Sequence, residues 1–142
     1  MKIKLPKKEY DRMLAHALEK RPEEACGLIA GHDSGTEEGM VRTIEKVYCL
    51  ANTDHSAEHF TLDPKEQLAA VRDMRAKGMK PLGNWHSHPE TPSRPSDEDK
   101  RLAFDRHASY LILSLADADR PVLNAFTING NDAHRDELEI IR

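Results

Sequence analysis

His86 and His88 stand two residues apart at the end of an apolar segment, and Pro89 follows them directly. On a β-strand, residues i and i+2 face the same side, so both imidazoles can point to one divalent metal ion. A loop punctuated by prolines then leads to an acidic helix start, Ser96-Asp97-Glu98-Asp99, and a carboxylate from this first turn can complete the set. Two histidines and one aspartate leave the fourth position of a tetrahedral zinc ion open for water, as in catalytic rather than structural zinc sites.

Each part of this motif also has a purely structural interpretation. Histidines two residues apart are common at solvated strand ends, and the prolines can simply stiffen a surface loop. Ser96-x-x-Asp99 matches the capping box of a helix N-terminus. The cap and the ligand are compatible, because a cap fixes where the side chains of the first helical turn point. The combination of histidine pair, stiff loop and acidic helix start within 14 residues favours the metal site.

A second motif competes for the metal. His55-Ser56-Ala57-Glu58-His59 matches H-x-x-E-H, a metalloprotease signature that needs both histidines one turn apart on a helix. The next residues, 60–62, look extended, and Asp63-Pro64 is a good start for a separate helix. We therefore predict that this segment is a loop and that its match to the signature is a coincidence.

Hydrolysis at such a metal needs a base that takes a proton from the attacking water and delivers it to the leaving group. Glu23 and Glu24 come directly before Ala25–Gly31, an apolar run that predicts a buried strand. Burial beside this strand would raise the pKa of a carboxyl group and make it useful as a base. A solvated acidic pair at a strand entrance is the alternative, and the residue types alone favour it.

Three helices are predicted to position these residues. An amphipathic pattern predicts a helix over 7–20, and the residue before Pro22 ends it. A second helix starts at Asp63-Pro64 and stops at Gly78, with Leu68, Val71 and Met74 on its buried face. Ser96 starts a third helix, which is predicted to run to about residue 107.

Apolar or β-branched runs predict the strands, which are 25–31, 40–50, 59–62, 82–88, 110–115, 122–128 and 137–141. The turn signal Asn129-Gly130 predicts that the last two strands pair as a hairpin. Interleaved helices and strands with a hairpin at the end predict an α/β (α+β) fold, in which helices flank a mixed sheet.

Length and composition limit the function further. The chain has 142 residues, 21 Lys+Arg against 25 Asp+Glu, and a net charge of −4, so we expect one domain over 1–142 and no nucleic-acid partner. No apolar stretch approaches the ~20 residues of a membrane span, and the N-terminal residues lack the apolar core of a signal peptide. Cys26 and Cys49 do not make a disulfide scaffold. These features predict a cytoplasmic protein and leave a homodimer open.

The segment Glu24-Ala25-Cys26-Gly27, followed by His86-Ser87-His88-Pro89, six further residues and Ser96-x-x-Asp99, resembles the pattern of the JAMM (MPN+) metallopeptidases of the Mov34/MPN family. That pattern is a glutamate followed downstream by H-[ST]-H-P-x(6)-S-x-x-D, and the chain matches it at every motif position. The short connections are similar to those of the compact bacterial and archaeal branch, which includes sulfur-carrier (CysO-cysteine type) peptidases.

The resemblance implies the MPN fold, a curved mixed sheet flanked by helices with cytidine-deaminase-like layering. It implies one Zn²⁺ ion per chain, bound by His86, His88 and Asp99. Glu24 would be the general base that holds the zinc-bound water. Ser96 would stabilise the oxyanion of the tetrahedral intermediate.

The reaction that the resemblance implies is hydrolysis of an amide or isopeptide bond after the C-terminal Gly-Gly of a ubiquitin-like sulfur-carrier protein. The extended tail is expected to bind by β-augmentation at an exposed strand edge. From their position in the chain, His59, Phe60 and Thr61 are candidate substrate-binding residues, together with the loop Glu90–Arg94.

Two other functions remain open at this point. A non-catalytic MPN scaffold or binding module would have lost its ligands, whereas all five motif residues are present here. A non-haem Fe(II) enzyme can use the same pair of histidines and carboxylate. Such oxygenases normally place their ligands on a larger β-barrel, which the predicted strands do not suggest.

Overall fold

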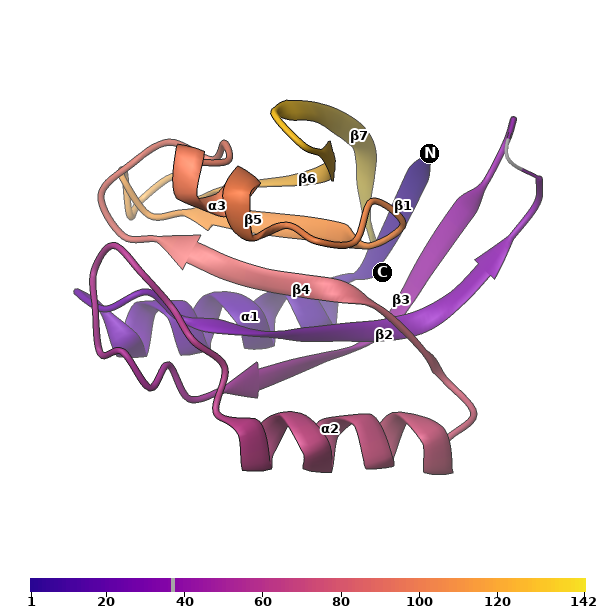
Figure 1. Ribbon diagram of the computed structural model, residues 1–142, viewed down its shortest axis with the longest axis horizontal. Helices are drawn as coiled ribbons and strands as arrows, with labels where there is room; N and C mark the ends of the chain where they lie inside the picture. The colour runs from indigo at the N-terminus through magenta and orange to yellow at the C-terminus, as the bar shows by residue number, and fades with distance from the viewer. Residues whose placement is uncertain (37) are drawn as a thin grey trace.

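The computed structural model describes residues 1–36 and 38–142, which form seven strands and three helices (Figure 1). In chain order the elements are β1 (Lys2–Pro6), α1 (Lys7–Lys20), β2 (Cys26–Ser34), β3 (Val41–Leu50), α2 (Pro64–Ala76), β4 (Lys80–His88), α3 (Asp97–Leu102), β5 (Ser109–Ser114), β6 (Val122–Asn129) and β7 (Asp132–Ile141). The strands pair in the order β1-β3-β2-β4-β5-β6-β7 and close into a barrel. The predicted mixed sheet with flanking helices is confirmed, and its closure was not predicted.

β1 closes the barrel because it pairs in parallel with the strands on both sides. Ile3 lies in register with Arg42 of β3 and with Leu138 of β7. The sequence pattern did not predict this strand, since five residues in which Ile3 and Leu5 alternate with lysines carry a weak signal. Both apolar side chains are fully buried in the central core, which explains why so short a strand is stable.

α1 packs against the central core and also covers the edge of β3 beyond its short pairing with β1. Met13 and Ala17 of this helix are fully buried. On its flank, Glu9 Oε1 accepts a hydrogen bond from the Val47 N–H at 2.8 Å, and Arg12 Nη1 donates to the Val47 carbonyl at 2.8 Å. Two side chains thus occupy backbone groups that a neighbouring strand would otherwise pair.

α2 covers the sheet face opposite α1, and its N-terminus forms as the sequence predicts. Asp63 caps the helix by accepting a hydrogen bond from the Glu66 N–H at 2.9 Å. Ala70 and Met74 are buried against β2 and β3. Leu68, which was predicted to be buried, is 52% exposed. That prediction was wrong because the contact face of α2 is narrower than its apolar stripe.

β4 lies in the middle of the sheet, antiparallel to β2 and parallel to β5. Trp85 belongs to the central core on the side of α1, so the alternation of the strand turns His86 and His88 to the opposite face. A Cβ atom on Gly83 (φ +148°) would overlap the Ser109 carbonyl, so glycine is required where β5 approaches. The strand therefore presents both histidines outside the central core.

One predicted strand does not form, and one predicted helix is shorter than expected. Residues 59–62 do not form a strand, because their hydrogen bonds go to loop residues and only Leu62 forms a single bridge, with Asn52. α3 ends at Leu102 rather than near 107, and the chain becomes extended at Ala103. No residue of α3 is buried, so tertiary packing does not extend this helix.

The C-terminal hairpin begins earlier than predicted. β6 pairs with residues 132–136 of β7, so the strand starts at Asp132 instead of at 137. Residues 137–141 pair with β1 and complete the barrel. The second half of β7 therefore closes the sheet and is not part of the hairpin.

Cys26 and Cys49 carry free thiols, and burial raises the pKa of the Cys26 thiol to about 12, as in an inert core residue. None of the described helices is long and apolar enough to cross a membrane.

Candidate metal centre

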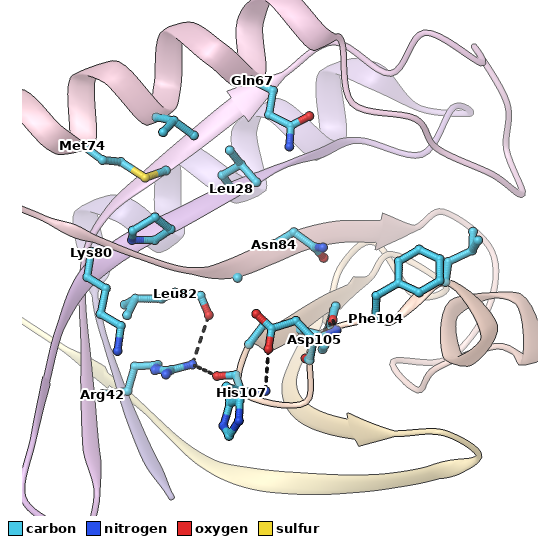
Figure 2. A pocket seen from close by; sticks show the side chains of 16 residues that line it. Leu28, Arg42, Gln67, Met74, Lys80, Leu82, Asn84, Phe104, Asp105 and His107 are labelled. Carbon is cyan, nitrogen blue, oxygen red and sulfur yellow. Dashed lines mark hydrogen bonds between the residues drawn. The ribbon is translucent and has the colours of Figure 1, made fainter.

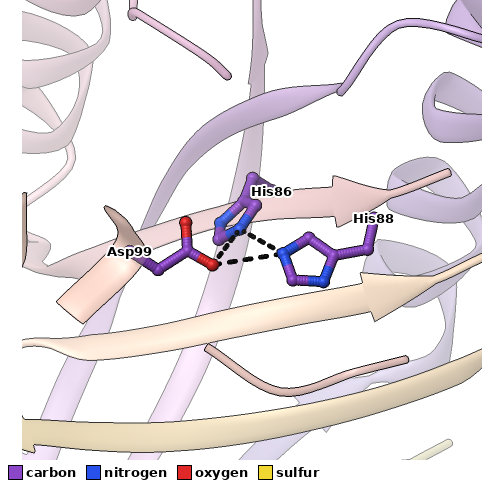
Figure 3. A group of neighbouring side chains, drawn as sticks. All are labelled: His86, His88 and Asp99. Atoms are coloured by element: carbon purple, nitrogen blue, oxygen red, sulfur yellow. Dashed lines mark hydrogen bonds and ion pairs between the residues drawn. The ribbon is translucent and has the colours of Figure 1, made fainter. Parts of the chain in front are cut away.

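Three side chains meet at the end of β4. His86 Nε2 and His88 Nε2 lie 3.1 Å apart, and Asp99 Oδ2 lies 3.3 Å from the first and 3.2 Å from the second (Figure 3). Ligand atoms about 2.0–2.1 Å from a tetrahedral zinc ion stand about 3.3–3.4 Å apart, so the donor set fits one ion. Within residues 1–36 and 38–142, no other trio of His, Cys, Asp or Glu side chains has such a spacing. The structure thus brings the three predicted ligands together.

The start of α3 places the aspartate. The Ser96 N–H donates to Asp99 Oδ2 at 2.9 Å, and the Asp99 N–H donates to Ser96 Oγ at 3.0 Å. This reciprocal pair is a capping box, so the structural interpretation of Ser96-x-x-Asp99 is confirmed. The same Oδ2 atom faces both histidines, so the cap and the candidate ligand coexist.

The two imidazoles are oriented by different contacts. His88 Nδ1 lies 2.9 Å from the Pro92 carbonyl, which favours Nε2 as its ligand atom. His86 Nδ1 is buried and has no hydrogen-bond partner among the described residues. Instead, the ring of Phe60 stacks on the His86 imidazole, with centroids 4.7 Å apart and an interplanar angle of 25°.

The charges of the three groups depend on one another. Burial alone would raise the pKa of Asp99, but hydrogen bonds with both histidines hold it well below its usual range. At His86, burial lowers the pKa by more than the neighbouring Asp99 raises it. At His88, hydrogen bonds with Asp99 and Pro92 raise the pKa despite burial. The shifts at Asp99 and His86 favour the carboxylate and the neutral imidazole, which are the forms that bind a metal, whereas the shift at His88 favours the charged imidazole.

Glu24 is buried directly before β2. Loss of hydration raises the pKa of its carboxyl group to about 8, with His88 lowering it and Asp99 raising it. Its Oε1 atom has no hydrogen-bond partner in the described part of the chain. Glu23, by contrast, is partly exposed and pairs with His55 at 3.1 Å. The predicted burial of a carboxyl group beside the strand is therefore found at Glu24. The alternative, a solvated acidic side chain, describes Glu23.

Ser87 ties the glutamate segment to the histidine strand, a role that the sequence analysis missed. The Ala25 N–H donates to Ser87 Oγ at 2.8 Å, and the Ser87 N–H donates to the Ala25 carbonyl at 2.9 Å. The feature of the sequence that could have predicted this role is the position of Ser87 between the two histidines. On a strand that position faces the core, where a hydroxyl group needs a partner.

The H-x-x-E-H segment is a loop, and none of its residues joins the metal-ligand trio, as predicted. Each of its histidines pairs with a glutamate adjacent to a candidate site residue. His55 Nδ1 lies 3.1 Å from Glu23 Oε1, and His59 Nδ1 lies 2.7 Å from Glu98 Oε2. The segment therefore spans the site from the Glu24 side to the α3 side.

The other candidate substrate residues lie in different settings. Thr61 Oγ1 donates to Asp54 Oδ2 at 2.7 Å within the loop. The loop 90–94 is fastened over β5, because Ser114 Oγ donates to the Thr91 carbonyl at 2.6 Å and Ser93 Oγ donates to the Ile112 carbonyl at 2.6 Å. The 59–61 segment thus adjoins the metal centre through Phe60, whereas the loop 90–94 covers a strand end.

A groove of about 410 Å³ lies between α2 and the segment 102–108 (Figure 2). Its apolar lining includes Leu28, Val71, Met74, Leu102, Phe104 and Tyr110, and Phe104 is 87% exposed. Asn84, Leu102 and Tyr110 also line a cavity of about 40 Å³ that includes His86 and Asp99. The groove therefore adjoins the cavity beside the candidate metal centre, although no sequence motif marked it.

A buried arginine closes the far end of this groove. Arg42 Nη1 donates to the carbonyls of Leu82 and His107 at 3.0 and 3.1 Å (Figure 2). The same atom donates to Ser109 Oγ at 2.8 Å. Its Nε lies 2.8 Å from Asp33 Oδ1. The arginine thus joins β3 and β4 to the start of β5, and its donors are engaged in structural contacts.

This arrangement can perform hydrolysis at a single metal ion, because it combines three convergent ligands, a buried carboxyl group of raised pKa and an adjoining groove. Residues 6–129 match the family model described as prokaryotic homologs of the JAB domain. The chain belongs to this family, and the resemblance to the JAMM peptidases is confirmed at that level.

Two curated relatives cover most of the chain. A CysO-cysteine peptidase from Mycobacterium tuberculosis is 35% identical over 116 residues, which are 82% of this chain and 75% of the relative. A desampylase from the archaeon Haloferax volcanii is 32% identical over 111 residues, which are 73% of this chain and 74% of the relative.

Solved structures share the fold. The solution structure of protein DSY2949 from Desulfitobacterium hafniense is 51% identical, with a TM-score of 0.87 over 97% of this chain and 92% of that chain. The JAB1/MPN domain protein AF2198 from Archaeoglobus fulgidus aligns over the full length of both chains with a TM-score of 0.59 and 24% identity. The predicted MPN fold is therefore confirmed.

Proposed function

We propose that the protein is a zinc-dependent peptidase that hydrolyses the amide or isopeptide bond after the C-terminal Gly-Gly of a ubiquitin-like, sulfur-carrier type protein. The observation that carries the proposal is the convergence of His86, His88 and Asp99 beside the buried carboxyl group of Glu24. Relatives named CysO-cysteine peptidase and desampylase support the reaction class.

The residues divide the chemistry between them. Zinc, when bound by the two histidines and Asp99, supplies a Lewis acid that activates water and polarises the scissile carbonyl. Glu24 takes the proton from the attacking water and delivers it to the leaving amine. A pKa of about 8 lies close to neutral pH, so the carboxylate form can accept the proton of water and the acid form can deliver it to the amine.

Ser96 is the proposed donor to the oxyanion. Its Oγ atom accepts a hydrogen bond from the Asp99 N–H, so the hydroxyl proton is left to donate. Ser96 is exposed at the start of α3, beside the ligand Asp99. Loss of one such donor typically lowers the rate by about 10²–10³.

The carrier tail is proposed to approach along the groove and to pair with the 59–61 segment. The Asn52 side chain bonds to the His59 carbonyl and the Thr61 N–H on one edge of this segment. In an extended backbone the intervening Phe60 peptide groups face the other edge, where a tail can pair. The adjoining cavity of about 40 Å³ suits glycine because it leaves no room for large side chains.

The test uses carrier proteins extended by one or more residues beyond Gly-Gly, with mass spectrometry as the readout. Release of the extension by the zinc-loaded protein, and its absence with a chelator, is the expected result. Intact carriers with fully loaded protein would favour the non-catalytic module. Tightly bound iron in protein purified without added metal would favour the oxygenase.

A further inference from the structure

The two histidines of the metal centre differ in what holds their rings. A metal-binding histidine usually donates its second ring N–H to a carboxylate, a carbonyl or water, which fixes the ring for binding. His88 has such a contact, with the Pro92 carbonyl at 2.9 Å. His86 has none among the described residues, although its Nδ1 atom is buried. Among the described residues, the contact that orients this ring is packing.

Phe60 provides that packing. Its ring lies 4.7 Å from the His86 imidazole, nearly parallel to it, and it lines the small cavity next to the ligand. Stacked rings at this distance attract each other, which favours the observed orientation of the imidazole. The centroid of the His88 ring lies 4.9 Å from that of the His86 ring, and the two rings are tilted by 56°.

The loop that carries Phe60 is attached to the helix that carries the third ligand. His59 Nδ1 lies 2.7 Å from Glu98 Oε2, and Glu98 precedes Asp99 in α3. Asn52 Nδ2 donates to the His59 carbonyl at 2.9 Å, which fixes the backbone at the same point. The loop thus connects the helix of one ligand to the ring of another.

We propose that Phe60 is a positioning residue for His86, that its aromatic stacking replaces the missing hydrogen bond, and that the His59–Glu98 pair fastens it in place. This inference rests on metal binding as proposed above, but not on peptidase activity. Loss of contacts that orient a ligand typically lowers metal affinity about 10–100-fold. Removing the Phe60 ring is therefore expected to weaken zinc binding by about this factor.

The test measures the zinc dissociation constant of each purified variant by competition with a chromophoric chelator. Phe60→Leu is expected to weaken binding about 10–100-fold, and Phe60→Tyr to restore it, because a tyrosine ring can stack in the same way. Phe104→Leu removes an exposed ring of the same kind and is expected to leave the affinity unchanged. Wild-type affinity in Phe60→Leu, or no rescue by Phe60→Tyr, would overturn the proposal.

A second pair of variants tests the fastening without changing the aromatic ring. His59→Gln breaks the pair with Glu98 and is expected to weaken zinc binding several-fold. His55→Gln breaks the similar pair with Glu23 on the same loop and serves as its matched control. Equal affinities of these two variants would contradict the role of His59. A wild-type protein that binds no zinc would refute the proposed function as well, whereas a tight wild type with unaffected variants refutes this inference alone.

Discussion

The hydroxyl oxygen of Ser87 accepts a hydrogen bond from the Ala25 N–H at 2.8 Å, and the Ser87 N–H donates back to the Ala25 carbonyl at 2.9 Å. This relationship joins the residue after Glu24 to the residue between the two histidines. The proposed base and the proposed ligands come from distant parts of the chain. This buried contact continues the pairing of β2 with β4 to the residue next to Glu24 and so helps to fix their relative position.

Replacing Ser87 by alanine is expected to disturb the site more than the fold. The Ala25 N–H would lose its partner while buried, which costs about 1–3 kcal/mol of unfolding free energy. We expect kcat to fall with little change in zinc affinity, because the histidines keep their own contacts. Denaturant unfolding and steady-state kinetics measure the two effects. Ser34→Ala, at an exposed serine, is the control, and an unchanged kcat in Ser87→Ala would contradict this role.

Glu24→Gln is expected to stabilise the metal-free protein at high pH. Burial raises the pKa of Glu24 to about 8 from 4.5, so the folded state favours the neutral form. The resulting penalty is absent below pH 4.5, grows as pH rises, and is complete above pH 8. Glutamine avoids it, so the variant should gain on the order of 2–4 kcal/mol at pH 9 and almost nothing at pH 4. Urea unfolding at both pH values checks this, and an equal effect at both would refute the buried carboxyl group.

The same substitution separates catalysis from binding. Glu24→Gln should bind zinc like the wild type yet lose hydrolysis of an extended carrier, because the amide cannot accept the proton. Metal content and product mass measured on one preparation decide the point. Retention of full activity by a zinc-loaded variant would remove Glu24 from the proposed mechanism.

Asp99→Asn is expected to lower zinc affinity by at least about 10-fold, since it replaces a charged ligand. Asp97→Asn changes an aspartate in the same helical turn that lies outside the ligand trio, so it should bind zinc normally. Chelator competition on both variants gives the comparison. The opposite ranking would move the third ligand to Asp97.

Asp33→Asn tests the pair that closes the groove. Hydrogen bonding to Arg42 lowers the pKa of Asp33 to about 2. Stability from this pair is therefore present above pH 3.8 and disappears as pH falls through 2. We expect the variant to lose about 1–2 kcal/mol at pH 7 and to approach the wild type near pH 2. Thermal unfolding of both proteins measures it, with exposed Asp132→Asn as the control.

The metal ligands were predictable because each signal is local. His86 and His88 share a strand face because side chains alternate along a strand. The capping box that holds Asp99 is recognisable from the four residues that begin at Ser96. The helix over 7–20 and the start at Asp63 were likewise found from spacing and capping. In these cases the residues that fix the geometry are close neighbours in the chain.

The features that were missed depend on distant contacts. Phe60 meets His86 only because the barrel brings the loop after β3 to the end of β4. β1 exists because two other strands accept it, and α3 is short because nothing packs against its end. Such outcomes follow from tertiary packing, which hydrophobic periodicity does not report.

Glu9 and Arg12 have a consequence for how the protein behaves at high concentration. Their side chains cover the Val47 backbone groups on the β3 edge, where a strand of a second copy could otherwise attach. Covered edges remove one route to fibril growth. The hydrogen bonds of these two side chains therefore protect the protein from aggregation. Substitutions that remove them are expected to cause turbidity in concentrated solution before they lower the rate of turnover.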